Sequence, residues 1–385
     1  MSFLDPYPST LTPRRSPSSS TVRFRNSQLS ISAVAASPLS LKQQTTHSMP
    51  PEKMAVFESL EDWATHHVLP LLKPVEQCWQ PASFLPDPTQ NKADFHDQVR
   101  ALRERTAQLP DDYFVVLVGD MITEDDLPTY QTIINTLDGV RTRLGRSPTP
   151  GQCGLGPGPR KKNRHGDLLR TYLYLSGRVD MLMIERTIQY LIGAGMEPRK
   201  QRNNPDLGSV NRHFQNEPTF DPMATGSLAK QAGDPVLAAH IRGPSASYET
   251  TRERYPLRIV EELLEVDPTG PMMAISSMME KKITMPAHLM YDGKEPRLFE
   301  HFSAVAQRLG VYAADDYADI LEFLVGRWGL EKLEGLTGEG RRARDFVCGL
   351  APRIRKLQER ADERAKKMEP HYAKFSWIFN KEVLL

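Results

Sequence analysis

The stretch Phe114–Leu137 constrains the fold more than any other part of the sequence. It follows a helical pattern and is unusually apolar for its length, a composition that suits a helix buried on several sides. Pro128 lies inside it, and an interior proline removes one helical hydrogen bond, which predicts a kink or a break there. The chain is therefore expected to build a bundle of other helices around this one.

Helical periodicity continues along most of the chain, and it predicts an all-α fold. Further helices are expected over Ser59–Leu72, Lys92–Leu109, Asp167–Ile192 (as a pair broken near Gly177), Pro256–Val266, Phe299–Leu309, Ala314–Trp328 and Arg341–Lys367. Strand signals are weak except in Phe375–Val383, which is compatible with a short C-terminal β-hairpin. The stretches Pro198–Asn216 and Thr225–Tyr255 are poorly periodic for parts of a helical bundle.

The bulk composition excludes several classes of protein. A formal net charge of +1 over 385 residues argues against a general nucleic-acid binder, which usually carries a strong basic excess. No run of about 18 apolar residues occurs, so no membrane span is predicted. Cys78, Cys153 and Cys348 are too few and too scattered for a disulfide framework or a zinc site, and they fit a reducing compartment.

The first 48 residues differ in composition from the rest of the chain. Within the first fifty there are twelve serines, five lysines or arginines and one acidic residue, Asp5. A serine-rich, arginine-bearing and acid-poor segment is typical of an organelle transit peptide; a plain disordered tail is the alternative. The prediction is a disordered transit peptide over residues 1–48, followed by one domain over residues 49–385.

Five long blocks of the sequence carry a resemblance to a known family. They read PDDYFVVLVGDMITEDDLPTYQTIINTLDGV, YLYLSGRVD, KKITMPAHLMYDG, HFSAVAQRLGVYAADDYADILEFLVGRW and FSWIF. From Val56 to Leu385 the chain resembles the plant plastid acyl-[acyl-carrier-protein] desaturases, soluble enzymes that introduce a cis double bond into stearoyl chains. The resemblance implies a ferritin-like four-helix core within a larger helical bundle. It also implies a homodimer in the plastid stroma that uses O₂, reduced ferredoxin and an acyl chain on acyl carrier protein.

The resemblance implies a centre of two iron ions (Fe²⁺) in that core. Such a centre takes one glutamate from each of two helices and a Glu-x-x-His from each of the other two. The first lone glutamate falls on Glu124, which in isolation is also compatible with an acid on a helix surface. The first Glu-x-x-His ends at His165, but its glutamate position holds Lys162, a cation where the metals need an anion.

The second half of the ligand set is also incomplete. The second lone carboxylate falls on Asn216, while Thr219 matches a threonine on the oxygen side of the family's iron centre and is assigned a catalytic role. The second Glu-x-x-His falls on Glu249 and Arg252 when it is aligned from downstream. Aligned from upstream, it falls on Tyr248 and Thr251 instead. At best Glu124, His165 and Glu249 remain as metal ligands.

The resemblance also extends to substrate contacts. Three positions of the long apolar helix match channel-lining positions, although ordinary core packing accounts for them equally well: Ile133, Thr136 and Leu137. The carrier protein is acidic, so a basic patch is expected to bind it. Two clusters are candidates for that patch, although such clusters are usually solvated surface: Arg199, Lys200 and Arg202, or Lys281 and Lys282.

The segment Gly151–Lys162, GQCGLGPGPRKK, departs most strongly from the family. The family reads a tryptophan-rich helix there, similar to WAVWTRAWTAEE. One coding string for that helix, read one base later, translates as GQCGLGPGPRK, so an out-of-frame reading explains the segment. Two functions therefore stay open: an active desaturase, or an impaired paralogue or frame-shifted product that binds acyl carrier protein or a homologous subunit without a complete di-iron site.

Overall fold

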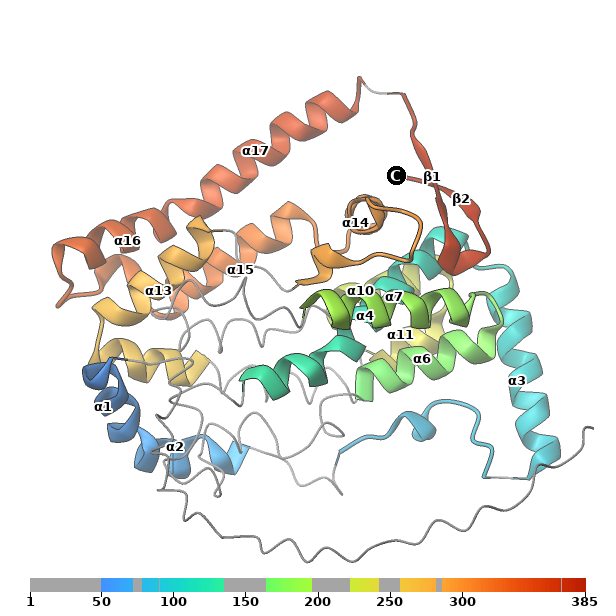
Figure 1. Cartoon of the computed structure of the whole chain (residues 1–385), viewed down its shortest axis with the longest axis horizontal. Coiled ribbons are helices and arrows are strands. Elements are labelled where there is room, and N and C mark those ends of the chain that lie inside the picture. The colour runs from blue at the N-terminus through green and yellow to red at the C-terminus, as the bar shows by residue number, and fades with distance from the viewer. Residues whose placement is uncertain are drawn as a thin grey trace, which may run out of the picture. The chain divides into compact units, whose positions relative to one another are not determined.

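The computed structural model describes residues 50–71, 78–89, 91–134, 164–195, 222–241, 257–281, 286–367 and 369–385, which are mostly helical (Figure 1). All of them belong to one unit, Thr46–Leu385. The α-helices are α1 Pro51–Ser59, α2 Glu61–His67, α3 Lys92–Ala107, α4 Asp111–Ile134, α6 Arg164–Ser176, α7 Met181–Gly195, α10 Pro222–Ala232, α11 Pro235–His240, α13 Thr269–Glu280, α14 Leu298–Arg308, α15 Ala314–Arg327, α16 Gly338–Cys348 and α17 Leu350–Ala365. Residues 257–266 are also helical. Short 3₁₀ helices are η1 Leu69–Leu71, η3 Pro81–Ser83, η7 Pro286–Leu289, η8 Leu330–Lys332 and η9 Ser376–Ile378.

The all-α prediction is confirmed, and so is the C-terminal hairpin. Strands β1 (Tyr372–Phe375) and β2 (Lys381–Leu384) pair antiparallel, with Tyr372 opposite Leu384. Gly177 separates α6 from α7 with a φ of +68°, a backbone conformation that glycine adopts without strain. Among the described residues, no helix has both the length and the apolar character needed to cross a membrane.

Some expectations about local structure differ from the structure. The single helix expected over Arg341–Lys367 is two helices, α16 and α17, divided at Gly349. Of the kink or break expected at Pro128, the break is wrong, because α4 continues as a helix to Ile134. The first part of Thr225–Tyr255 is helical in spite of its poor periodicity, because it lies in α10 and α11. The Asp234 side chain caps α11, and Pro235 occupies the first turn, where its missing N–H costs nothing.

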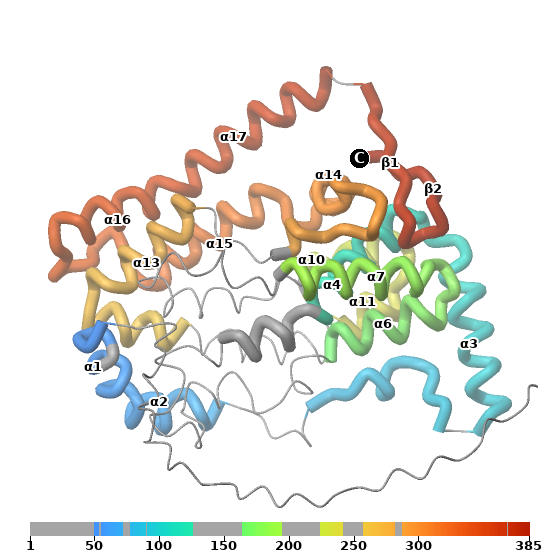
Figure 2. The backbone as a smooth tube through the Cα atoms, viewed as in Figure 1, coloured from blue at the N-terminus to red at the C-terminus, as the bar shows by residue number. Residues whose placement is uncertain are grey.

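Helix α4 lies at the centre of the main core, as its composition predicts. Its side chains from Tyr113 to Val118 are fully buried, as are Met121 and Ile122. The helix packs against α6, α7, α10 and α14, which lie around it in the backbone trace (Figure 2). A separate apolar cluster joins residues 257–266 with α13, α15 and α16. The prediction that α4 is covered on several sides is therefore confirmed.

Gly119 lets α14 approach α4 closely. A Cβ atom built on Gly119 would lie 2.0 Å from Cε2 of Phe302, a ring that is only 4% exposed. We expect Gly119→Ala to lower the free energy of unfolding by about 1–3 kcal/mol, the usual cost of overfilling a packed core. Urea denaturation measures this change. In a Phe302→Leu background the same substitution should cost less, and an equal cost in both backgrounds would contradict the clash.

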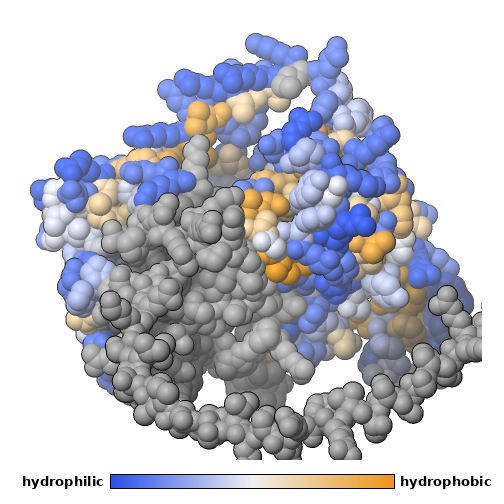
Figure 3. Space-filling model, in the orientation of Figure 1, coloured by the Kyte–Doolittle hydropathy of each residue, from blue (hydrophilic) through white to orange (hydrophobic). Residues whose placement is uncertain are grey.

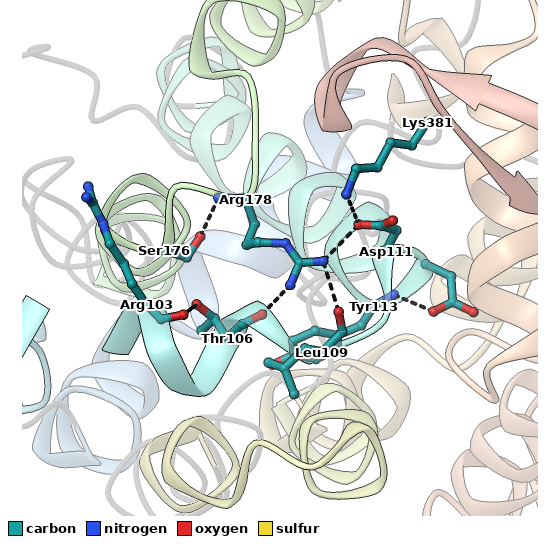
Figure 4. Close-up of polar contacts among 9 residues, drawn as sticks. Arg103, Thr106, Leu109, Asp111, Tyr113, Ser176, Arg178 and Lys381 are labelled. Carbon is teal, nitrogen blue, oxygen red and sulfur yellow. Dashed lines mark hydrogen bonds and ion pairs between the residues drawn. The ribbon is translucent and has the colours of Figure 1, made fainter. Parts of the chain in front are cut away.

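Arg178 joins three parts of the main core (Figure 4). Its guanidinium donates hydrogen bonds to the carbonyl oxygens of Thr106 and Leu109, at the end of α3, and to the carboxylate of Asp111 at the start of α4. Lys381 of β2 donates to the same carboxylate over 2.8 Å. These bonds satisfy carbonyls that the end of α3 leaves open, and they tie the C-terminal hairpin to α4.

The hairpin also inserts a large side chain into the main core. Trp377 in η9 is fully buried, and its Nε1 donates a 2.9 Å hydrogen bond to Oγ1 of Thr187 on α7. Its ring lies edge-on to Phe302 of α14, with 6.3 Å between the ring centroids. Ser376 donates to the carboxylate of Asp292. The C-terminal segment is therefore an integral part of the core.

Candidate metal and substrate site

Helices α4 and α6 carry the two predicted metal ligands that the structure describes. Glu124 lies on α4 and is only 1% exposed, so the alternative of a surface acid is wrong. His165 is the second residue of α6 and is 5% exposed. The two helices pack against each other. One carboxylate and one imidazole are therefore buried on neighbouring helices of the main core.

An aromatic layer covers the start of α6. The ring of Trp79 lies 5.3 Å from that of His165, and the buried guanidinium of Arg164 lies 5.6 Å from the same indole. Phe84 extends the layer from Trp79 to His240 of α11, with ring distances of 5.7 and 4.8 Å. Burial lowers the pKa of His240. Trp79 is not among the site residues predicted from the sequence, because no local pattern near it indicates a contact with His165.

The residue that follows Glu124, Asp125, belongs to a cluster of charged side chains. Arg170 of α6 donates hydrogen bonds to Asp125 of α4 and to Glu185 of α7. Burial raises the pKa of the Asp125 carboxyl, and the Arg170 guanidinium opposes that shift. Burial likewise raises the pKa of Asp167, near the start of α6. One guanidinium therefore joins three helices, and one of its partners, Asp125, directly follows the predicted ligand Glu124.

A second polar cluster lies one helical turn before Glu124. Asp120 is fully buried and accepts hydrogen bonds from Oγ1 of Thr225, at 3.0 Å, and from the hydroxyl of Tyr312, at 3.2 Å. Tyr312 has a φ of +56°, a conformation that non-glycine residues seldom adopt. The turn of α4 from Asp120 to Asp125 is thus held by side chains from α6, from α10 and from Tyr312 in the segment between α14 and α15.

The other predicted site residues cannot be compared with the structure. Ile133 lies in the last turn of α4, but its side chain is outside the described residues. Four further predicted site residues lie outside them entirely: Thr136, Leu137, Thr219 and Glu249. The substituted ligand positions Lys162 and Asn216, and the whole of Gly151–Lys162, lie outside them as well. Their roles remain predictions from the resemblance.

The described donors are of the kind that holds iron. Carboxylate oxygen and imidazole nitrogen suit an iron ion that changes redox state, and both donors are withdrawn from water. Within the described ranges no three His, Cys, Asp or Glu side chains are grouped to hold a metal ion. The donor types of Glu124 and His165 are therefore compatible with part of a metal site, and the described residues do not supply a complete one.

Comparison with known proteins identifies the family. The family described as Fatty acid desaturase matches residues 52–379, which is most of the chain. The chain belongs to this family. Among its relatives, the stearoyl-[acyl-carrier-protein] 9-desaturase 6 of Arabidopsis thaliana is 66% identical over 357 residues, covering 92% of this chain and 91% of the relative. The corresponding enzymes of Solanum commersonii and Ricinus communis are 59% and 57% identical, each over 90% of this chain and 87% of the relative.

Membership of the desaturase family confirms the resemblance found in the sequence. The family match, over residues 52–379, includes the Gly151–Lys162 segment and both poorly periodic stretches. These segments are therefore local departures within a chain that matches the family on both sides of them. The relatives are named chloroplastic, in agreement with the predicted plastid location. Members of this family are di-iron enzymes, which accords with a buried carboxylate and imidazole on adjacent helices.

Proposed function

We propose that the chain is a plastid acyl-[acyl-carrier-protein] desaturase that introduces a cis double bond into a saturated chain of the stearoyl type. One observation carries this proposal: 66% identity to a stearoyl-[acyl-carrier-protein] 9-desaturase over 92% of the chain. Identity at this level over nearly the whole length favours the enzyme over the alternative of an impaired paralogue or frame-shifted product. Residues 1–48 are proposed as the transit peptide that directs the chain to the plastid.

The proposed reaction removes one hydrogen from each of two adjacent carbons of the acyl chain. These two hydrogens, with two electrons from reduced ferredoxin and two protons, reduce one O₂ to two water molecules. Iron, when bound, supplies the activation of O₂ in this family. Glu124, His165 and Glu249 are proposed as its ligands in this chain. Thr219 is proposed to lie on the side of the iron centre that faces O₂.

The remaining roles belong to side chains that hold the substrate and exclude water. Ile133, Thr136 and Leu137 are proposed to line an apolar channel for the acyl chain. The aromatic layer of Trp79 and Phe84 covers His165 and limits the access of water to it. Burial of this kind strengthens electrostatic interactions within a site, because the effective dielectric constant falls. A homodimer is proposed, as in the family.

A direct assay tests the proposal. The full chain is incubated with stearoyl-acyl carrier protein, O₂ and reduced ferredoxin, and the fatty acids are analysed by mass spectrometry. Iron is measured in the same preparation. Oleoyl product together with bound iron would support the proposal. Absence of any unsaturated product from stearoyl, palmitoyl and myristoyl carriers, with or without added iron, would contradict it.

The surface of α17 offers a docking site for the acidic carrier. Five cations recur at intervals of three or four residues, four of them along one side of α17 and the fifth in the turn that follows it. We name this set the α17 stripe: Arg353, Lys356, Arg360, Arg364 and Lys367. All five are exposed, and the surface over α17 is largely hydrophilic (Figure 3). None of them forms an ion pair within the part of the chain that the structure describes, although Glu363 lies at the edge of the stripe.

The α17 stripe faces away from the packed side of its helix. Arg355 marks that packed side, since it binds Asp315, Asp319 and Glu322 of α15. The guanidinium of Arg353 also lies over the ring of Phe346, 5.8 Å from its centroid. Cations that form no ion pair among the described residues create a positive potential that attracts an acidic protein. Of the two clusters predicted from sequence, Lys281 is exposed at the end of α13, while Lys282 and residues 199–202 lie outside the described residues.

Reversing two charges of the α17 stripe is expected to weaken carrier binding. The double variant Arg360→Glu, Arg364→Glu should raise KM for the stearoyl-acyl carrier protein roughly tenfold at low salt. The value of kcat should stay unchanged, because these charges affect the association of the two proteins and not the reaction that follows it. Steady-state kinetics at several salt concentrations measure this. The matched control is Lys92→Glu, Arg100→Glu, two exposed cations on α3. An equal rise of KM in both double variants would contradict a specific site on α17.

A further inference from the structure

The turn of α4 that carries Glu124 is held by a guanidinium on the helix that carries His165. Asp125 follows Glu124 directly, and its side chain is 6% exposed. Arg170 lies on α6, five residues after His165, and its two terminal nitrogens bind Asp125 and Glu185 separately. Its planar fork can engage two carboxylates in fixed directions, which a lysine ammonium cannot do.

This contact fixes how α4 is rotated relative to α6. Successive residues of an α-helix are turned by about 100°, so fixing the direction of Asp125 also fixes that of Glu124. The helix can then neither rotate nor slide along α6 without breaking a partly buried, charge-assisted hydrogen bond. On the far side of the same turn, Asp120 is held by Thr225 and Tyr312, so the backbone between Asp120 and Asp125 has little freedom.

We infer that Arg170 is a positioning residue for the metal site, which sets the separation of Glu124 and His165 before a metal ion binds. The inference rests on the proposed assignment of these two residues as ligands. Arg170 itself binds no metal, since a guanidinium is always charged and has no acceptor. Its effect passes through Asp125 to α4 and through Glu185 to α7.

Arg178 supplies a matched control for a merely structural role. It also joins the region after α6 to α4, but it does so at Asp111. Asp111 lies thirteen residues before Glu124, which is about 20 Å along a helix with a rise of 1.5 Å per residue. Loss of Arg178 removes three hydrogen bonds and destabilises the same pair of helices. It leaves the turn around Glu124 intact.

The test measures metal affinity in the full chain, with Co²⁺ as the probe, by titration calorimetry and by the visible absorption of the bound ion. We expect Arg170→Gln to weaken Co²⁺ binding about 10–100-fold, the usual effect of losing a group that orients a ligand. Asp125→Asn should weaken it similarly, because it removes the anion that Arg170 holds. Arg170→Lys should lie between these variants and the unchanged chain. Arg178→Gln should alter the affinity less than about twofold, even where it lowers stability more.

The outcomes separate this inference from the proposed function. If the unchanged chain binds Co²⁺ and Arg170→Gln binds it equally well, the positioning role is wrong and the ligand assignment stands. If Arg178→Gln weakens binding as much as Arg170→Gln, the effect is one of general stability and the inference is overturned. If neither the unchanged chain nor His165→Ala binds Co²⁺, the ligand assignment fails and this inference fails with it. Arg170→Lys keeps the test decisive should Arg170→Gln not fold.

Discussion

Replacing Trp377 with alanine is expected to lower the free energy of unfolding by about 3–5 kcal/mol, the usual cost of truncating a large buried aromatic side chain. The side chain is fully buried between α7 and α14, so its removal leaves a cavity that the rigid helices around it cannot close. The hydroxyl of Thr187 also loses the hydrogen bond from the indole Nε1. The segment that carries Trp377 also loses the largest of its fully buried side chains.

Urea denaturation followed by circular dichroism measures this loss. The matched control is Tyr372→Ala in the adjacent strand β1, where the side chain is 57% exposed. Truncating a side chain on that outer surface should cost less than about 1 kcal/mol. A Trp377 variant as stable as the Tyr372 variant would show that the hairpin is not part of the cooperative core.

Replacing Asp234 with alanine is expected to have an effect of similar size. Its carboxylate is fully buried, accepts a hydrogen bond from the hydroxyl of Tyr172, and caps α11 through the backbone N–H of Leu237. It also lies 3.5 Å from Nε of Arg105 on α3. Alanine removes all of these partners at once and leaves a buried hydroxyl and a guanidinium uncompensated, which costs about 3–5 kcal/mol.

Two further variants show whether the loss of stability comes from the contacts of Asp234 or from the removal of any carboxylate. Asp234→Asn keeps an oxygen that can accept from Tyr172 or from Leu237, so it should recover part of the loss. Asp97→Ala removes a surface carboxylate that is 71% exposed and pairs with Arg100. Such pairs contribute about 0–1 kcal/mol. Hydrogen exchange of the α11 amides should rise in Asp234→Ala, and unchanged exchange there would refute the capping role.

The central helix and the C-terminal hairpin could be predicted because their signals are local. The apolar composition of Phe114–Leu137 requires burial whatever the partners are, and Gly177 marks a turn on its own. The persistence of α4 through Pro128 could not be predicted, because it depends on the packing of distant helices. The same holds for α10 and α11, whose residues look irregular in sequence but pack on each other, while α10 also packs on α4.

The candidate site was predictable only in part. Glu124 stands in a helix that also carries Asp120, Asp125 and Asp126, and the chain alone does not show which of these carboxylates is buried among other helices. The resemblance to desaturases selected Glu124, and the structure shows that it is buried. Arg170 and Trp79 escaped notice, because each acts through residues far away in the sequence. Contacts of that kind follow from tertiary packing.

The position of Trp377 affects the order in which a newly made chain can fold. Synthesis proceeds from the N-terminus, and segments begin to associate as they emerge. Helices α4, α7 and α14 are complete long before residues 372–385 leave the ribosome, so the space that Trp377 fills between α7 and α14 stays open and apolar until then. During that interval the exposed surface is a site for chaperones and for wrong association with other chains. A nascent chain stalled before residue 372 would carry every α-helix that the structure describes and still lack the Trp377 side chain that fills the core.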